Sequence, residues 1–216
     1  DYVLLVGDAA RRDALVQALR AEVSARYGDL RDAGDYTRII NDAQFARLDG
    51  YLDDARARGL QVIGLAPVHD PAGRLFAPTL VLEPGDDAAL MQDEIFGPIL
   101  PIRTVASLDA AIAEVNARDR PLALYPFSDD RSEVDRLLHA TLAGGVTVND
   151  SLLHFGVSAL PFGGIGPSGM GAYHGRAGFD AMSKALPILW QPRRAGSDLL
   201  KPPYSKVARF IDFLVR

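Results

Sequence analysis

Short apolar runs alternate along this chain with segments in which apolar residues recur every three or four positions. The run Tyr2–Val6 predicts a strand, and Asp8 after it is typical of a residue that caps the start of a helix. In the segment that follows, Leu15, Leu19 and Val23 recur every four residues, which predicts one apolar face on that helix.

A second helix is predicted from about Ala43, with Phe45, Leu48 and Leu52 on one face and Gly59 at its end. Further along, the pattern predicts a buried strand at 62–65 and a hairpin-like loop at 66–76. Four more strands are predicted at 79–82, 100–105, 122–127 and 146–149. Three more helices are predicted: one at 86–92, one at 108–115 that is capped by Ser107, and one from Asp129 or Asp130 to Gly144-Gly145. Strands that alternate with helices of about 10–15 residues predict an α/β fold with a largely parallel sheet.

Composition excludes several classes of protein. The 216 residues are 48% hydrophobic with a net charge of -5, which excludes a disordered polymer and argues against a nucleic-acid partner. No apolar run approaches the roughly 18 residues needed to span a bilayer, and we expect a cytoplasmic protein with no membrane span. The chain has no cysteine, and its four histidines lack metal-ligand spacing, so no metal site is predicted.

The segment 160–175 reads LPFGGIGPSGMGAYHG, and so many glycines permit very close backbone approach, either to a ligand or to another backbone. A tightly packed structural turn therefore stays open beside a binding role. A phosphate cradle is not expected, because Pro167 removes one of the amides that would bind the phosphate. Ser168 lacks the sequence context of a hydrolase nucleophile.

This segment resembles the glycine-rich signature near the end of aldehyde dehydrogenases. The sequence EIFGP at 94–98 resembles the cofactor motif of that family. Three further segments, YTRIIN at 36–41, PLALY at 121–125 and GGVTVND at 144–150, are similar to its class 3 branch, and most of all to bacterial coniferyl aldehyde dehydrogenases. The resemblance covers essentially the whole chain, and it implies the fold of an aldehyde dehydrogenase catalytic domain.

The resemblance implies cofactor contacts with NAD or NADP for two residues. Glu94 matches the position that binds the nicotinamide ribose, and a carboxylate suits that role because it accepts hydrogen bonds from both hydroxyls. Phe96 matches the position that rests against the nicotinamide. From the residues alone, a surface Glu and a core Phe before a turn remain an alternative.

The substrate pocket is predicted from aromatic residues around the glycine-rich segment. In relatives the residues just before PFGG line the aldehyde tunnel, so the resemblance implies that His154, Phe155 and Phe162 form part of its wall. Tyr173 is expected to direct its hydroxyl towards the active site. Core packing is an open alternative for Phe155 and Phe162, and a structural role is the preferred interpretation of His174.

The chain is predicted to divide into a catalytic domain at 1–180, an oligomerisation arm at 181–192 and a tail at 193–216. Pro187 bars the apolar stretch Ala181–Trp190 from a central strand position, and the resemblance implies that this arm pairs subunits, at least as a dimer. Apolar residues from Val207 to Leu214 predict an amphipathic helix in the tail, capped by Ser205.

The chain opens with a strand pattern and no Met, which suggests that sequence precedes Asp1. The resemblance implies that the nucleophilic cysteine, the general-base Glu, the oxyanion Asn and the dinucleotide-binding domain all lie upstream, so no catalytic residue is assigned here. We therefore expect a fragment of an enzyme that oxidises an aldehyde, with coniferyl aldehyde or another aromatic aldehyde as the candidate substrate, and no activity from this chain alone. A non-catalytic nucleotide-binding or small-molecule-binding module and an oligomerisation domain are the alternatives.

Overall fold

The centre of the fold is a four-stranded sheet with the order β1-β6-β5-β2. The computed structural model of the chain describes residues 1–31, 34–193, 196–197, 202, 204 and 215. Strand β6 (Ile99–Val105) pairs in parallel with β1 (Val3–Val6) and β5 (Thr79–Leu82), whereas β2 (Gln61–Gly64) is antiparallel to β5. The prediction of an α/β fold with a largely parallel sheet is therefore confirmed.

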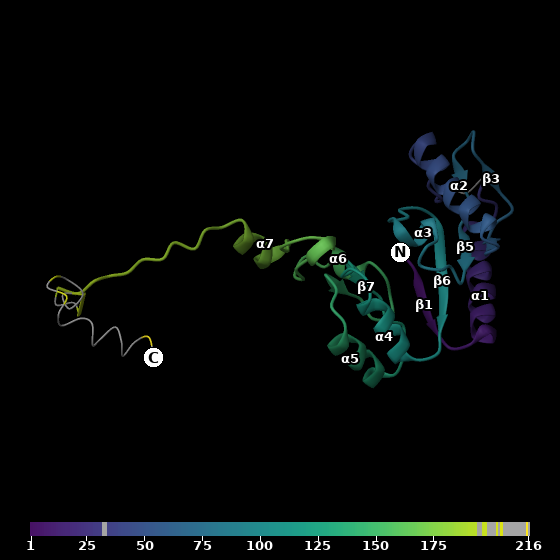
Figure 1. Cartoon of the computed structure of the whole chain (residues 1–216). Helices are drawn as coiled ribbons and strands as arrows, with labels where there is room; N and C mark the ends of the chain where they lie inside the picture. Colours follow the sequence, from purple (N-terminus) through teal and green to yellow (C-terminus); the bar gives the residue numbers. More distant parts are fainter. Residues whose placement is uncertain (32–33, 194–195, 198–201, 203, 205–214, 216) are drawn as a thin grey trace.

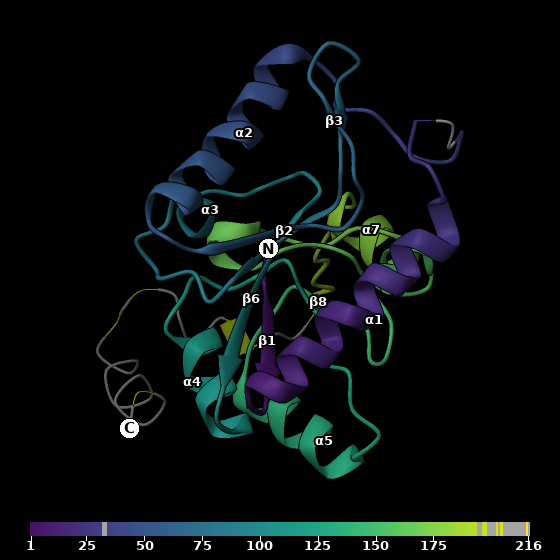
Figure 2. The ribbon, with the colours of Figure 1, turned by 90° about the vertical axis from the view of Figure 1, so that its right-hand side faces the viewer.

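Two helices pack on opposite faces of this sheet, α1 (Ala9–Tyr27) and α2 (Asp42–Ala57). Successive side chains of a strand point to opposite faces, and along β5 Leu80 packs with the α1 cluster while Val81 packs with the α2 cluster. Figure 2 shows α1 crossing in front of the sheet.

Side-chain caps start the main helices, as the sequence indicates. The side chains of Asp8, Ser107 and Asp130 each accept a hydrogen bond from a backbone amide at the start of α1, α4 (Leu108–Asn116) and α5 (Arg131–Ala140). Asn41 does the same for α2, which therefore begins one residue before the predicted start.

Several predicted boundaries are wrong. Strand β2 is the edge of the sheet, and the burial expected for 62–65 holds fully only for Leu65: Val62 and Ile63 are partly buried and Gly64 is exposed. The helix predicted at 86–92 shortens to α3 (Ala89–Gln92), and α5 ends at Ala140, well before Gly144-Gly145, with Thr141 as its C-cap. The threonine hydroxyl donates to the Leu137 carbonyl and so competes with continuation of the helix.

The strands predicted at 122–127 and 146–149 are reduced to β7 (Ala123–Leu124) and β8 (Gly145–Val146), which pair in parallel. Single hydrogen bonds continue the pairing on both sides, from the Gly144 amide to the Pro121 carbonyl and from the Asn149 amide to the Pro126 carbonyl. Prolines carry no amide hydrogen, which explains why the regular ladder ends so early.

The remaining elements surround this sheet and the glycine-rich segment. They are the hairpin of β3 (His69–Asp70) and β4 (Leu75–Phe76), the helices α6 (Leu153–Gly156) and α7 (Gly175–Ala181), and a short 3₁₀ helix at Gly166–Ser168. The hairpin was predicted, but the two helices were not. Helix α7 runs through Gly178, close to the predicted end of the catalytic domain.

Beyond α7 the chain leaves the folded part as an extended segment (Figure 1). Its apolar side chains are exposed, including Leu186, Leu189 and Trp190, the last two at 88% each. The amphipathic helix predicted after Ser205, with apolar residues from Val207 to Leu214, lies outside the described residues. Among the residues that the structure describes, no helix is both long enough and apolar enough to cross a membrane.

Tyr36 links the segment before α2 to the hairpin. Because its hydroxyl is partly buried, we expect the folded chain to lose stability at high pH. Its hydroxyl donates a 2.7 Å hydrogen bond to the Phe76 carbonyl, and burial, with a smaller contribution from Tyr27, raises the pKa of Tyr36 to about 12. Because the folded pKa lies above the unfolded value of about 10, this stability is fully present below pH 10 and is lost as pH rises towards 12. We expect Tyr36→Phe to show a weaker fall in stability between these pH values, as measured by urea unfolding in a pH series. An unchanged pH profile in Tyr36→Phe would contradict this assignment.

Candidate cofactor and substrate site

The turn that joins α3 to β6 presents two of the predicted site residues to solvent. The Phe96 ring is 83% exposed, and the Glu94 side chain beside it is also exposed. Ile95 between them is fully buried in the cluster under α2. The alternative of a core phenylalanine is therefore wrong, because the buried residue of this turn is Ile95.

The backbone of this turn has an unusual conformation. Phe96 has a φ of 44°, in the left-handed region that side chains other than glycine rarely adopt. Gly97 lies against α2, where an added Cβ would be 2.6 Å from a methyl carbon of Leu48. A larger residue at position 97 would require the Leu48 side chain or the turn to shift, so close packing on α2 favours the glycine of the EIFGP motif.

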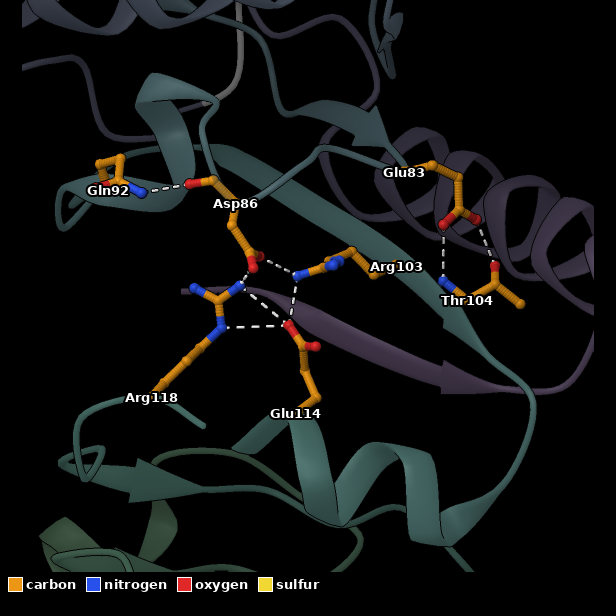
Figure 3. Close-up of polar contacts among 7 residues, drawn as sticks. All are labelled: Glu83, Asp86, Gln92, Arg103, Thr104, Glu114 and Arg118. Atoms are coloured by element: carbon orange, nitrogen blue, oxygen red, sulfur yellow. Dashed lines mark hydrogen bonds and ion pairs between the residues drawn. The ribbon is translucent and has the colours of Figure 1, made fainter. Parts of the chain in front are cut away.

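A cluster of four charged residues holds the loop that leads into this turn (Figure 3). Arg103 of β6 and Arg118, which follows α4, both contact Asp86 and Glu114, at 2.6 Å for Arg103 to Asp86 and 3.0 Å for Arg118 to Glu114. The hydrogen bond from Arg103 and the charge of Arg118 hold the pKa of Asp86 below its usual value. Arg118 also lies over the Tyr2 ring, 5.0 Å from its centre, so the cluster ties the start of β1 to the same loop.

A hollow of about 780 Å³ opens beside the exposed ring of Phe96. Its wall includes Tyr36, Ile40, Asn41 and Gln44, all from the segment that carries the class 3 resemblance or from the first turn of α2. Ile40 is 80% exposed there. Local sequence patterns do not predict that 36–44 lies beside Phe96, because the packing of α2 brings these two distant segments together.

The glycine-rich segment is closed by backbone contacts. Phe162 and Tyr173 exchange two hydrogen bonds of 2.9 Å between their main chains, so the segment returns on itself. A Cβ on Gly163 would collide with the Gly171 carbonyl, and one on Gly164 with the Ser168 carbonyl. These glycines are therefore explained by close approach of backbone to backbone, the structural turn that the sequence left open.

The four predicted pocket residues lie together around Phe162. The centre of its ring is 5.7 Å from those of His154 and Tyr173 and 5.6 Å from that of Phe155. Phe155 and Tyr173 are 52% and 49% exposed, so both present apolar surface outwards as well as packing inwards. The structure thus supports a packing role and leaves surface free for a ligand.

The two histidines of this aromatic cluster differ in their contacts. His154 is 7% exposed, and its Nδ1 lies 2.8 Å from the Thr147 hydroxyl. His174 has a φ of 82° and packs on the ring of Tyr173, 4.5 Å between centres. Among the described residues, His154 Nε2 and His174 Nδ1 are buried without a hydrogen-bond partner. Buried polar atoms usually have partners, so these two nitrogens are exceptions among the described residues.

In the part of the chain that the structure describes, no hydrogen bond or aromatic contact joins the Glu94–Phe96 turn to the aromatic cluster. The predicted cofactor residues and the predicted substrate residues therefore form two separate groups. Both groups were predicted from the sequence. The residues that support the Glu94–Phe96 turn were not predicted, and they come from α2, β6 and the end of α4.

Comparison with known proteins identifies the family. The chain belongs to the aldehyde dehydrogenase family, whose model matches residues 3–186. It is 43% identical over 215 residues to a probable coniferyl aldehyde dehydrogenase of Caulobacter vibrioides, covering 97% of this chain and 44% of that protein. A probable coniferyl aldehyde dehydrogenase of Pseudomonas aeruginosa is 45% identical over 206 residues, covering 95% of this chain and 42% of that protein.

Solved structures agree with this assignment. AldH of Staphylococcus aureus in its substrate-bound state superimposes with a TM-score of 0.82 at 36% identity, covering 99% of this chain and 46% of that one. An aldehyde dehydrogenase of Mycobacterium tuberculosis complexed with NAD+ gives a TM-score of 0.71 at 25% identity, covering 83% and 37%. The chain thus spans less than half the length of these relatives. The resemblance indicated by the motifs and the predicted fold class are both confirmed.

Proposed function

We propose that this chain forms the cysteine-domain portion of an NAD- or NADP-dependent enzyme that oxidises an aromatic aldehyde, such as coniferyl aldehyde, to a carboxylic acid. One observation carries this proposal: the Glu94–Phe96 turn presents an exposed carboxylate and an exposed ring on a backbone anchored by buried Ile95. When bound, the nicotinamide cofactor accepts a hydride from the aldehyde carbon.

The two residues of the turn fit the two parts of such a cofactor. No described residue donates a hydrogen bond to the Glu94 carboxylate, which leaves its oxygens free to accept bonds from two ribose hydroxyls. The Phe96 ring offers an apolar face that is 83% exposed, large enough to exclude water from one side of a nicotinamide. Both side chains bind and orient, and neither takes part in proton transfer.

The aromatic cluster supports the choice of an aromatic aldehyde. The rings of Phe155, Phe162 and Tyr173 pack edge to face, and Phe155 and Tyr173 keep about half of their surface exposed as an apolar surface for an aromatic substrate. Relatives named as coniferyl aldehyde dehydrogenases match 95% or more of this chain. These residues therefore form one wall of the pocket that selects the substrate.

The exposed segment after α7 supports assembly. Its apolar side chains are not buried by other parts of the described structure. The exposed fractions of Leu186, Ile188 and Trp190 range from 68% to 88%. Residues 181–192 are accordingly proposed as an arm that pairs two copies into a dimer, between a catalytic domain at 1–180 and a tail at 193–216. The lack of a described membrane-crossing helix is compatible with a cytoplasmic location.

The proposal predicts a difference in activity between two proteins. The protein encoded by the complete reading frame that contains this chain is expected to reduce NAD or NADP only when coniferyl aldehyde or a related aldehyde is added. The 216-residue chain alone is expected to show no such reduction, because it has no cysteine to act as the nucleophile. The measurement is the absorbance of reduced nicotinamide over time. Aldehyde-dependent reduction by the chain alone, or none by the complete protein, would overturn the proposal.

A further inference from the structure

Arg47 of α2 lies directly behind the Glu94–Phe96 turn, and its guanidinium forms a fork around that turn. One nitrogen donates a 2.6 Å hydrogen bond to the Ile95 carbonyl, and another donates a 3.3 Å bond to the Glu94 carbonyl. Arginine offers several donors in one rigid plane, so a single side chain can hold two successive carbonyls in a fixed orientation.

The guanidinium is itself held in place by its neighbours on α2. Its Nε donates to the Gln44 side chain at 2.7 Å, and one terminal nitrogen donates to the Tyr51 hydroxyl at 3.0 Å. It also lies over the Tyr51 ring, 5.2 Å from the centre. Tyr51 in turn donates to the Asp93 carboxylate at 3.3 Å, which adds a second link between α2 and the turn.

This support matters because the turn is strained. The left-handed φ of 44° at Phe96 costs free energy for a residue with a side chain, and such conformations persist only when surrounding contacts impose them. The carbonyls that Arg47 holds belong to the two residues immediately before Phe96. The side chains of Glu94 and Phe96 are exposed to solvent, so the backbone of the turn sets the direction in which their Cα–Cβ bonds leave the chain.

We propose that Arg47 is a positioning residue that fixes the backbone of the Glu94–Phe96 turn so that both side chains face the cofactor. The contacts of Arg47 with the turn are present without any ligand. The predicted effect of Arg47 on cofactor binding rests on the function proposed above. The Arg47 guanidinium contacts the backbone of the turn and not the exposed faces of the Glu94 and Phe96 side chains. Arg47 does not touch the reacting atoms either.

The first experiment tests the backbone directly in the 216-residue chain, by NMR relaxation of the Phe96 and Gly97 amides. The wild type is expected to show order parameters near the rigid value of about 0.85, whereas Arg47→Met is expected to fall below about 0.6 at these two amides. Arg47→Lys should lie between them, because an ammonium group cannot hold two carbonyls as a planar fork. Arg58→Met is the matched control, since among the described residues Arg58 at the end of α2 pairs with Asp54 and Asp87 and not with the turn.

The amide of Val81 in the central strand β5 reports whether each variant is folded. A rigid turn in Arg47→Met with an intact β5 would overturn the proposal, and so would equal loosening in Arg58→Met. If Arg47→Met fails to fold, the order parameters of the Phe96 and Gly97 amides are measured in Arg47→Lys instead. Values equal to those of the wild type in Arg47→Lys would then overturn the proposal.

The second experiment measures steady-state kinetics in the complete protein. Arg47→Met is expected to raise the KM for NAD or NADP about tenfold or more, with less than a twofold change in the KM for the aldehyde, while Arg58→Met changes neither. A merely structural loss would lower kcat and leave the ratio of the two KM values unchanged, which would overturn the proposal. If the wild-type protein itself has no cofactor-dependent activity, the proposed function fails, and the NMR measurement still tests the role of Arg47.

Discussion

Replacing Glu94 by Ala is expected to weaken the binding of NAD or NADP to the complete protein by about 2–3 kcal/mol, roughly 30- to 150-fold in Kd. The carboxylate would accept hydrogen bonds from two ribose hydroxyls, and bonds to a charged acceptor are worth more than neutral ones. Removing it leaves both hydroxyls without a partner in a site from which Phe96 excludes water. Isothermal titration with the oxidised cofactor measures the effect.

Two further variants make this measurement specific. Glu94→Gln keeps one acceptor oxygen and loses the charge, so its affinity should lie between those of the wild type and Glu94→Ala. Glu22→Gln removes an exposed carboxylate of α1 whose ion-pair partner in the described part of the chain is Arg26, and the affinity of this variant should equal that of the wild type. Equal affinities of the wild type and Glu94→Ala would show that the carboxylate does not bind the cofactor.

Gly164→Ala is expected to destabilise the glycine-rich segment by about 3 kcal/mol, at the upper end of the usual cost of overpacking. The added Cβ would meet the carbonyl of Ser168 and lie 2.6 Å from the Gly169 nitrogen. These are backbone atoms, which cannot turn away as a flexible side chain can. Separation of the two arms of the segment would break the pairing between Phe162 and Tyr173 and disperse the aromatic cluster.

The near-ultraviolet circular dichroism of these aromatic rings, followed through urea unfolding, measures that destabilisation. Gly156→Ala is the matched control, because a Cβ at Gly156 meets open space. Its stability should change by about 0.5 kcal/mol or less. If Gly164→Ala unfolds at the same urea concentration as Gly156→Ala, the close backbone approach at Gly164 is not what maintains the segment.

The sequence was sufficient to predict the parts of the fold that depend on local signals. The caps at Asp8 and Ser107 and the strand Thr79–Leu82 were identified correctly, because each depends on a few neighbouring residues. The strand around 122–127 was overestimated because prolines end its ladder. Helices α6 and α7 were missed, since each has fewer than eight residues and little apolar periodicity.

The candidate site was predicted in its exposed residues but not in their support. Glu94 and Phe96 stand in a recognisable motif, whereas Arg47 reaches the turn from 47 positions away for Glu94 and 48 for Ile95. No sequence periodicity marks such a contact. The same holds for the cluster of Asp86, Arg103 and Arg118, whose members become neighbours only when the sheet has formed. Contacts between distant segments are fixed by tertiary packing.

A crystal structure of the complete protein with NAD bound would test the role of the Glu94–Phe96 turn most directly. We expect the ribose next to the nicotinamide to donate hydrogen bonds from its two hydroxyls to the Glu94 carboxylate. We also expect the nicotinamide to lie against the ring of Phe96, with the φ of Phe96 still near 44°. A cofactor bound elsewhere, or a turn in which Phe96 has moved into the core, would show that this turn is not the cofactor site.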